Sequence, residues 1–228
     1  MSRSEHKPKS VCQAPAVSES IEDQGMNHRI LGELEGVDVG GWGLTLALPA
    51  FQPFYERWYN DGGERQDTRG ADEKAGRFRV ILPHMPAAGP DRNGLQPPSD
   101  AQVAAVEYLR SNQGRVADAV KAALVEQAPA AFHWEYIQEN VSDEMKERLM
   151  TPDGMMQAVE LQNIVIGVTG HGGLAQVGFS FHSEILEPEH GVCVIVLREA
   201  PILVGTWDDL IDLERLDEDG LGDDDEFE

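Results

Sequence analysis

Four strand-like segments follow one another between residues 160 and 207, and they constrain the fold of this chain more than any other feature. The segments read ELQNIVIGV, LAQVGFSFH, GVCVIVL and APILVGTW. The first and last connections between them, TGHGG and REAP, are short and contain turn-forming residues. Short strands with tight connections of this kind predict an antiparallel meander.

Two further strands are predicted nearer the N-terminus. Leu44, Leu46 and Leu48 alternate with small or polar residues, which is the period of a half-buried strand. The segment RFRVIL, residues 77 to 82, is the second strand, and Pro83 is expected to stop it.

The clearest helical pattern lies between these strands and the meander. Ser99 or Asp100 is expected to cap its N-terminus. An apolar stripe then follows at helical spacing, formed by Val103, Val106 and Leu109. Gly114 is expected to end this helix and Pro129 to end a second one, which predicts a short helical hairpin. VSDEMKERLM and TPDGMMQAV predict two further short helical pieces.

These separate helical and strand blocks predict an α+β fold, with an antiparallel β-sheet and the helical hairpin packed on one face. We expect residues 1–26 to form a disordered arm, because they are rich in Ser, Pro, Lys and Glu. Residues 27–213 are expected to form a single α+β domain, and residues 214–228 an acidic disordered tail.

Charge limits the classes of partner. The chain has 41 acidic residues against 18 Lys and Arg, a formal net charge of −23. Phosphate backbones and anionic membranes are bound by clustered Lys and Arg, so direct binding to nucleic acid or to a membrane is not expected. A cationic protein partner is compatible with this charge.

The two cysteines, Cys12 and Cys193, are expected to be free thiols, because one lies in the predicted arm and the other in a predicted buried strand. Free thiols suit a reducing compartment. The N-terminus has no apolar stretch typical of a secretory signal, and the chain has no run of about 20 apolar residues that could span a bilayer. The sequence therefore predicts a cytoplasmic protein.

Acidic and histidine residues cluster near the ends of the predicted meander strands, and they are the main candidates for chemistry. The cluster includes Glu184, Glu187, Glu189 and His190. Carboxylate and imidazole groups could bind zinc or exchange a proton, but no helix-borne HExxH pattern is present, and HSE at 182 to 184 is not followed by PCxxC. We therefore favour a structural turn, with Gly191 at positive φ and Glu189 or His190 bonding to backbone. Recognition of a partner is the second interpretation, and catalysis the third.

Other motifs have structural interpretations. GHGG at 170 to 173 is a hairpin turn, because a phosphate-binding loop would be followed by a helix. No GxSxG motif is present. The aromatic stretch FYERWY, which includes Trp58 and Tyr59, is interpreted mainly as core and rim, with a recognition patch as the alternative. No metal and no cofactor are expected.

Two stretches together resemble an uncharacterised bacterial domain family. PSDAQVAAVEYLRSNQGRVADAVKAALVEQAP resembles its helical segment, and LQNIVIGVTGHGGLAQVGFSFHSEILEPEHGVCVIVLREAPILVGTWDD resembles its β segment. The family has a Trp-Asp-x-Glu-His-Gly turn between two strands. Glu189, His190 and Gly191 match the end of that turn, whereas Leu186 and Glu187 replace its Trp and Asp.

The same resemblance extends to a later Val-Gly pair, here Val204 and Gly205, and covers about residues 40 to 207. A Cys that is common in the family just before the turn is Glu184 here, which argues against a shared metal or catalytic site. In size and context the family resembles the small acidic immunity proteins that bacteria use against polymorphic toxins.

We therefore expect a non-enzymatic, immunity-type protein that neutralises a cognate toxin, such as a cationic nuclease, by occluding its active site. The expected binding residues are Glu184, Glu187, Glu189, His190, Trp58 and Tyr59. Two alternatives remain: an acidic DNA mimic that inhibits a DNA-handling protein, and a hydrolase that uses the Glu/His cluster. The oligomeric state is not indicated by the sequence.

Overall fold

The computed structural model describes residues 25–37, 41–55, 69–83, 96–132, 134, 137, 139, 141–171 and 173–211. Its strands are β1 (Gly25–His28), β2 (Gly32–Val37), β3 (Gly41–Ala47), β4 (Arg77–Pro83), β5 (Glu160–His171), β6 (Leu174–Ser183), β7 (Glu187–Leu197) and β8 (Ala200–Gly205). Its helices are the 3₁₀ helix η2 (Pro49–Phe51) and the α-helices α1 (Ala71–Lys74), α2 (Asp100–Ala131), α4 (Asp143–Leu149), α5 (Pro152–Gln157) and α6 (Trp207–Ile211).

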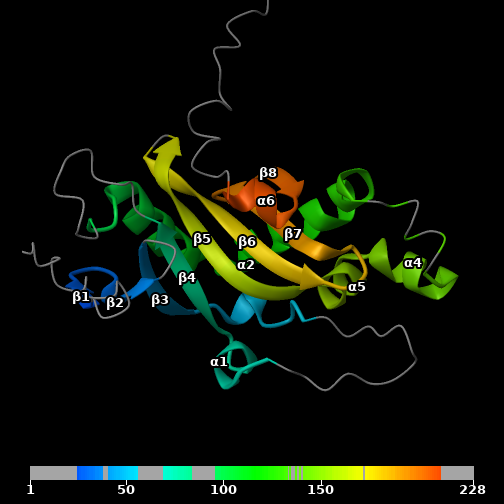
Figure 1. Cartoon of the computed structure of the whole chain (residues 1–228), viewed down its shortest axis with the longest axis horizontal. Coiled ribbons are helices and arrows are strands. Elements are labelled where there is room, and N and C mark those ends of the chain that lie inside the picture. The colour runs from blue at the N-terminus through cyan, green and yellow to red at the C-terminus, as the bar shows by residue number, and fades with distance from the viewer. Residues whose placement is uncertain are drawn as a thin grey trace, which may run out of the picture.

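All eight strands form one sheet, in which their order in space is their order in the chain (Figure 1). Every neighbouring pair is antiparallel except β4 and β5, which run parallel. The long helix α2 lies on the connection between these two strands, as a parallel pair requires. The predicted α+β fold with a mainly antiparallel sheet is confirmed, and the four predicted strands of the meander are β5 to β8.

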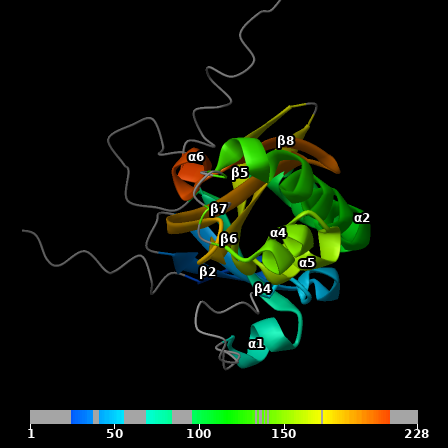
Figure 2. The same ribbon diagram turned by 90° about the vertical axis from the view of Figure 1, so that its right-hand side faces the viewer.

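Helices cover the sheet from both sides. Figure 2 shows α2, α4 and α5 on one side of the sheet and α6 on the other. In β7, Val192, Val194 and Val196 belong to the large core that includes the α2 residues. Cys193 and Ile195 alternate with them and pack against Leu210 of α6. Because both faces of this strand are covered, its sequence is an uninterrupted apolar run.

The thiol of Cys193 is expected to be almost unreactive in the folded protein. Its side chain is fully buried, and burial, followed by the charge of Asp209, raises the pKa of Cys193 to about 12. Only the thiolate is nucleophilic. In a Cys12→Ser variant, iodoacetamide at pH 8 should modify Cys193 at least about 100-fold more slowly than in urea-unfolded protein. Leu210→Ala should accelerate the reaction; equal rates in folded and unfolded protein would contradict this placement of Cys193.

One glutamine joins the two strands of the parallel pair. Gln102, in the first turn of α2, is almost completely buried. Its Nε2 donates to the carbonyl oxygens of Pro83 in β4 (2.8 Å) and Ile166 in β5 (3.1 Å), and its Oε1 accepts from the backbone N–H of Ser99 (2.9 Å). Ser99 completes the capping box and donates to the carbonyl oxygen of Val168 (2.9 Å). The helix N-terminus therefore fixes the end of β4 and the second half of β5 to each other.

The prediction of a helical hairpin was wrong. The two helical stretches form one element, α2, with a kink at Asn112 (φ −125°, ψ 17°). The side chain of Asn112 donates to the carbonyl oxygen of Tyr108 (2.9 Å), in competition with the helical backbone. Gly114, which was expected to end the first helix, continues it, and Pro129 lies inside the last turn. The chain therefore bends at this point and does not reverse.

The N-terminal hairpin of β1 and β2 was not predicted. β1 begins at Gly25, two residues before the expected start of the domain. The remainder of the predicted arm and the predicted tail lie outside the described residues. Phe54 and Tyr55, the first two residues of FYERWY, are buried in the core, which supports the core interpretation for these two residues.

No helix in the described ranges is both long and apolar enough to span a membrane.

Candidate protein-binding groove

The connection between β6 and β7 is a tight turn over residues 184–186. Ser183, which precedes it, is fully buried. Its hydroxyl donates to the carbonyl oxygen of Ala158 (2.8 Å) and accepts from the backbone N–H of Leu186 (3.0 Å). These two bonds anchor the turn to the chain that leads into β5.

The Glu-His segment follows this turn as a bulge in β7. Phe181 is paired with Val192, and Ser183 is paired with Glu187, so residues 188–191 lie opposite His182 alone. Gly191 has φ +64°, and a Cβ there would lie 2.8 Å from the carbonyl oxygen of Phe181. The predicted positive φ at Gly191 is confirmed.

The side chain that bonds to the backbone in this bulge is Glu187. Its Oε1 accepts from the backbone N–H groups of Glu189 (3.3 Å) and His190 (3.4 Å). The prediction that Glu189 or His190 would supply this bond was wrong. Glu187 can do so because it precedes the bulge, where its carboxylate reaches the exposed N–H groups two and three residues ahead.

The imidazole of His190 lies between two carboxylates. Its Nε2 is 3.9 Å from Oε2 of Glu189, and its Nδ1 is 3.8 Å from Oδ2 of Asp208 in α6. These separations are too long for hydrogen bonds. The imidazole therefore lies between the bulge and α6 at the surface, without a hydrogen bond to either carboxylate.

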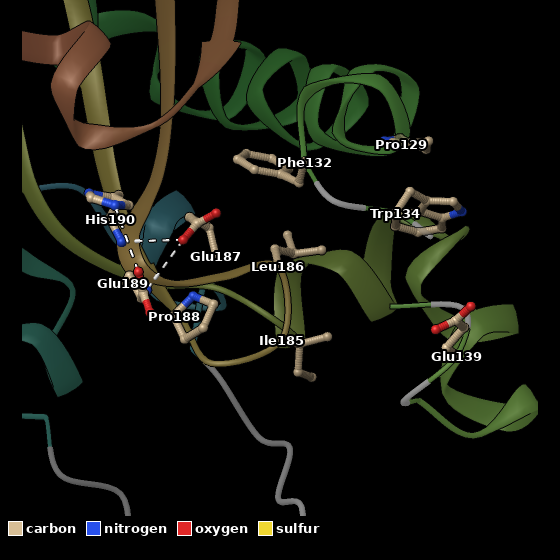
Figure 3. A pocket seen from close by; sticks show the side chains of 10 residues that line it. All are labelled: Pro129, Phe132, Trp134, Glu139, Ile185, Leu186, Glu187, Pro188, Glu189 and His190. Atoms are coloured by element: carbon tan, nitrogen blue, oxygen red, sulfur yellow. Dashed lines mark hydrogen bonds and ion pairs between the residues drawn. The ribbon is translucent and has the colours of Figure 1, made fainter. Parts of the chain in front are cut away.

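The bulge forms one wall of an open groove of about 900 Å³ (Figure 3). The opposite wall comes from the end of α2 and from Trp134 and Glu139. The lining residues are Pro129, Phe132, Trp134, Glu139, Ile185, Leu186, Glu187, Pro188, Glu189 and His190.

The groove combines an apolar floor with an acidic rim. Phe132, Ile185 and Leu186 are largely buried and expose only small fractions of their surface. Glu139 and Glu189 are exposed, and neither Lys nor Arg occurs among the described residues of the lining. Such a surface can accept an apolar side chain and a positive charge side by side.

The groove brings together three of the six predicted binding residues: Glu187, Glu189 and His190. Glu184 is not among the lining residues; it lies in the turn, with its Oε1 4.0 Å from Nε2 of His182. Trp58 and Tyr59 lie outside the described residues. Three lining residues were not predicted from the sequence: Phe132, Trp134 and Glu139. The two aromatic residues that follow Pro129, Phe132 and Trp134, could have indicated this part of the groove.

A second polar cluster fixes the kink of α2 to the turn between β7 and β8. The hydrogen bond between Tyr108 and Glu199 is the main cause that raises the pKa of Tyr108, and it also lowers the pKa of Glu199. Nη2 of Arg115 lies 3.0 Å from Oε1 of Glu199. Each of these groups has a partner within the cluster, so its role is structural.

In the described ranges, no three His, Cys, Asp or Glu side chains are grouped in a way that could hold a metal ion.

The fold and the groove together define an α+β domain with a chain-ordered sheet and a surface cleft at one end of its long helix. The chain belongs to the family described as domain of unknown function DUF6985, whose model matches residues 80–211. The matched part begins within β4 and ends with α6, so β1 to β3 lie outside it. The expected resemblance to an uncharacterised domain family is confirmed. No curated protein and no solved structure matches the chain.

Proposed function

We propose that this protein is a cytoplasmic, immunity-type binding protein that neutralises a cognate toxin protein by occluding the toxin's active site. The observation that carries the proposal is the groove, where an apolar floor lies beside a carboxylate rim. Interfaces obtain their affinity from a few desolvated anchor residues surrounded by polar groups. Trp134, which is half-buried, is a suitable anchor, and Glu187 and Glu189 are suitable rim residues.

The charge of the chain supports a cationic partner. A net charge of −23 produces a negative potential that accelerates the encounter with a basic protein and slows the approach of nucleic acid. This steering weakens as salt screens the charges. We therefore expect the association rate with the partner to fall steeply as ionic strength rises, with a smaller change in the dissociation rate.

The arrangement of the acidic groups supports binding over hydrolysis. Glu187 uses one carboxylate oxygen to hold two backbone N–H groups, and His190 lies at the exposed end of the groove between Glu189 and Asp208. Catalysis by a carboxylate and an imidazole requires both to reach one reacting atom. Here the carboxylate of Glu187 binds the backbone of the bulge, and the imidazole of His190 lies at the rim of the groove.

The test is coexpression with the protein encoded beside this gene. We expect the native chain to restore growth of cells that express the neighbouring toxin, and to copurify with it. Trp134→Ala should weaken the complex about tenfold or more, as truncation of a buried aromatic anchor does.

The matched control is Ile202→Ala, because Ile202 is 46% exposed on β8 and does not line the groove. This variant should rescue growth as well as the native chain does. Failure of the native chain both to rescue growth and to copurify with any neighbour-encoded protein would refute the proposal.

A further inference from the structure

We propose that the groove recognises an arginine side chain of its protein partner, with the guanidinium bound to Glu187 and an adjacent apolar side chain of the partner on the floor beside Leu186. This inference rests on the proposed function, because it specifies the feature of the partner that the groove selects. The carboxylate of Glu187 lies in the groove and is bonded to the backbone of the bulge through one of its two oxygens.

The carboxylate of Glu187 is oriented by two hydrogen bonds within its own bulge. Its Oε1 accepts from two consecutive backbone N–H groups, those of Glu189 and His190. In Figure 3, dashed lines join this oxygen to both nitrogens, and the second oxygen points toward the side of the groove that Phe132 lines. A carboxylate that is already ordered loses little conformational entropy on binding.

The surroundings of this carboxylate favour a delocalised cation. Phe132 and Leu186 are largely buried, and Trp134 is half-buried, so the groove beside Glu187 is an apolar surface with aromatic rings. A guanidinium is weakly hydrated, stacks on aromatic faces and has five N–H donors that can serve more than one acceptor. An ammonium is compact and strongly hydrated, so it would be desolvated here at greater cost.

Among the carboxylates near the groove, Glu187 is the preferred acceptor for the guanidinium, because the imidazole of His190 lies beside the other two, Glu189 and Asp208. Glu189 has His190 at 3.9 Å, and Asp208 has the same imidazole at 3.8 Å. The imidazole ring of His190 therefore occupies one side of each of these two carboxylates. Among the described residues, the side chain of Glu187 accepts hydrogen bonds from the backbone N–H groups of Glu189 and His190 and pairs with no cation, so its negative charge remains available to the partner.

The experiment uses the full chain and three tripeptides, acetyl-Leu-X-Leu-amide, in which X is arginine, lysine or citrulline. Binding is followed by NMR through the indole N–H signal of Trp134, assigned with Trp134→Phe. We expect saturable binding of the arginine peptide, at least about fivefold weaker binding of the lysine peptide, and no measurable binding of the uncharged citrulline peptide.

Glu187→Gln should weaken the arginine peptide about tenfold, because it removes a charge-assisted hydrogen bond. Glutamine keeps a carbonyl oxygen for the two backbone N–H groups, so the bulge should remain folded, and an unchanged melting temperature verifies this. The control Glu33→Gln removes an exposed charge of β2 that does not line the groove, and it should change the affinity less than twofold.

Absence of saturable arginine-peptide binding, equal binding of all three peptides, or an unchanged affinity in Glu187→Gln would each overturn the inference. These results separate it from the proposed function. A toxin that copurifies equally with the native chain and with Glu187→Gln supports the function and refutes the arginine site. Arginine-selective binding without any toxin partner supports the site and refutes the function.

Discussion

Replacement of Gly191 by valine should destabilise the protein by roughly 3 kcal/mol or more. Two effects combine at this position. The backbone has φ +64°, which a β-branched residue adopts only with strain, and the new Cβ would lie 2.8 Å from the carbonyl oxygen of Phe181. That oxygen belongs to the neighbouring strand and cannot move without disturbing the sheet. Urea denaturation monitored by circular dichroism measures the loss.

Gly173 is the matched control for this prediction. It also has a positive φ, +82°, but nothing lies within 4 Å of a Cβ built there. Gly173→Val should therefore show only the conformational strain and be clearly less destabilising. His190→Ala should have a small effect, since the imidazole is largely exposed and makes no short contact. Equal losses at Gly191 and Gly173 would show that the Phe181 contact is unimportant.

Gln102→Met is expected to cost about 3 kcal/mol or more. Methionine has a similar length and shape, so it fills the space but removes the partner of three backbone groups: the buried carbonyl of Ile166 and the partly buried carbonyl of Pro83 and N–H of Ser99. Each unsatisfied buried group costs about 1–3 kcal/mol. Hydrogen exchange should in addition show faster exchange at the end of β4 and in the second half of β5 than in β6.

Gln113→Met provides the comparison within the same helix. Oε1 of Gln113 accepts one hydrogen bond, from the backbone N–H of Ala50 (3.1 Å), in a partly buried setting. Its loss should cost only about 1 kcal/mol. A similar loss of stability for the two variants would contradict the role of Gln102 at the junction of β4 and β5.

The C-terminal strands could be predicted because the pattern of their apolar side chains indicates which faces are buried. Val192, Val194 and Val196 face one layer of helices, Cys193 and Ile195 face another, and the resulting apolar run has few other interpretations. The apolar stripe of α2, formed by Val103, Val106 and Leu109, could be predicted because its helical spacing indicates one buried face. β1 and β2 lack this signal, because β1 has no buried residue and the apolar positions of β2 are few.

The kink of α2 at Asn112 and the parallel pairing of β4 with β5 depend on tertiary contacts, which a local sequence pattern does not indicate. Gly114 is a weak helix former, yet the helix continues through it because α2 packs along the sheet, and tertiary packing overrides propensity. The interruption falls instead at Asn112, where the side chain competes for the carbonyl of Tyr108. The orientation of β5 relative to β4 is set by the path of α2 across the sheet.

The candidate site was predictable only in part. Glu187, Glu189 and His190 are consecutive or nearly so, and the turn signal at Gly191 indicated that they would be presented at the end of a strand. Phe132 and Trp134 come from a distant part of the chain. Their proximity to the bulge results from the length of α2 and its position on the sheet, which the sequence does not encode locally.

The chain order of the strands has a consequence for how the protein folds. Each strand from β2 to β8 pairs with the strand that immediately precedes it, and most of these pairs are joined by short connections, so most of the sheet can form by zipping of successive hairpins at low contact order. Two pairings require closure of a long connection: β3 with β4, across residues 48–76, and β4 with β5, across residues 84–159. The second connection is the longer one and contains α2. We therefore expect the two blocks, β1 to β4 and β5 to β8, to acquire protection early in pulsed hydrogen exchange. Closure of the β4–β5 junction should then be the slow step, and Gln102→Met should retard it.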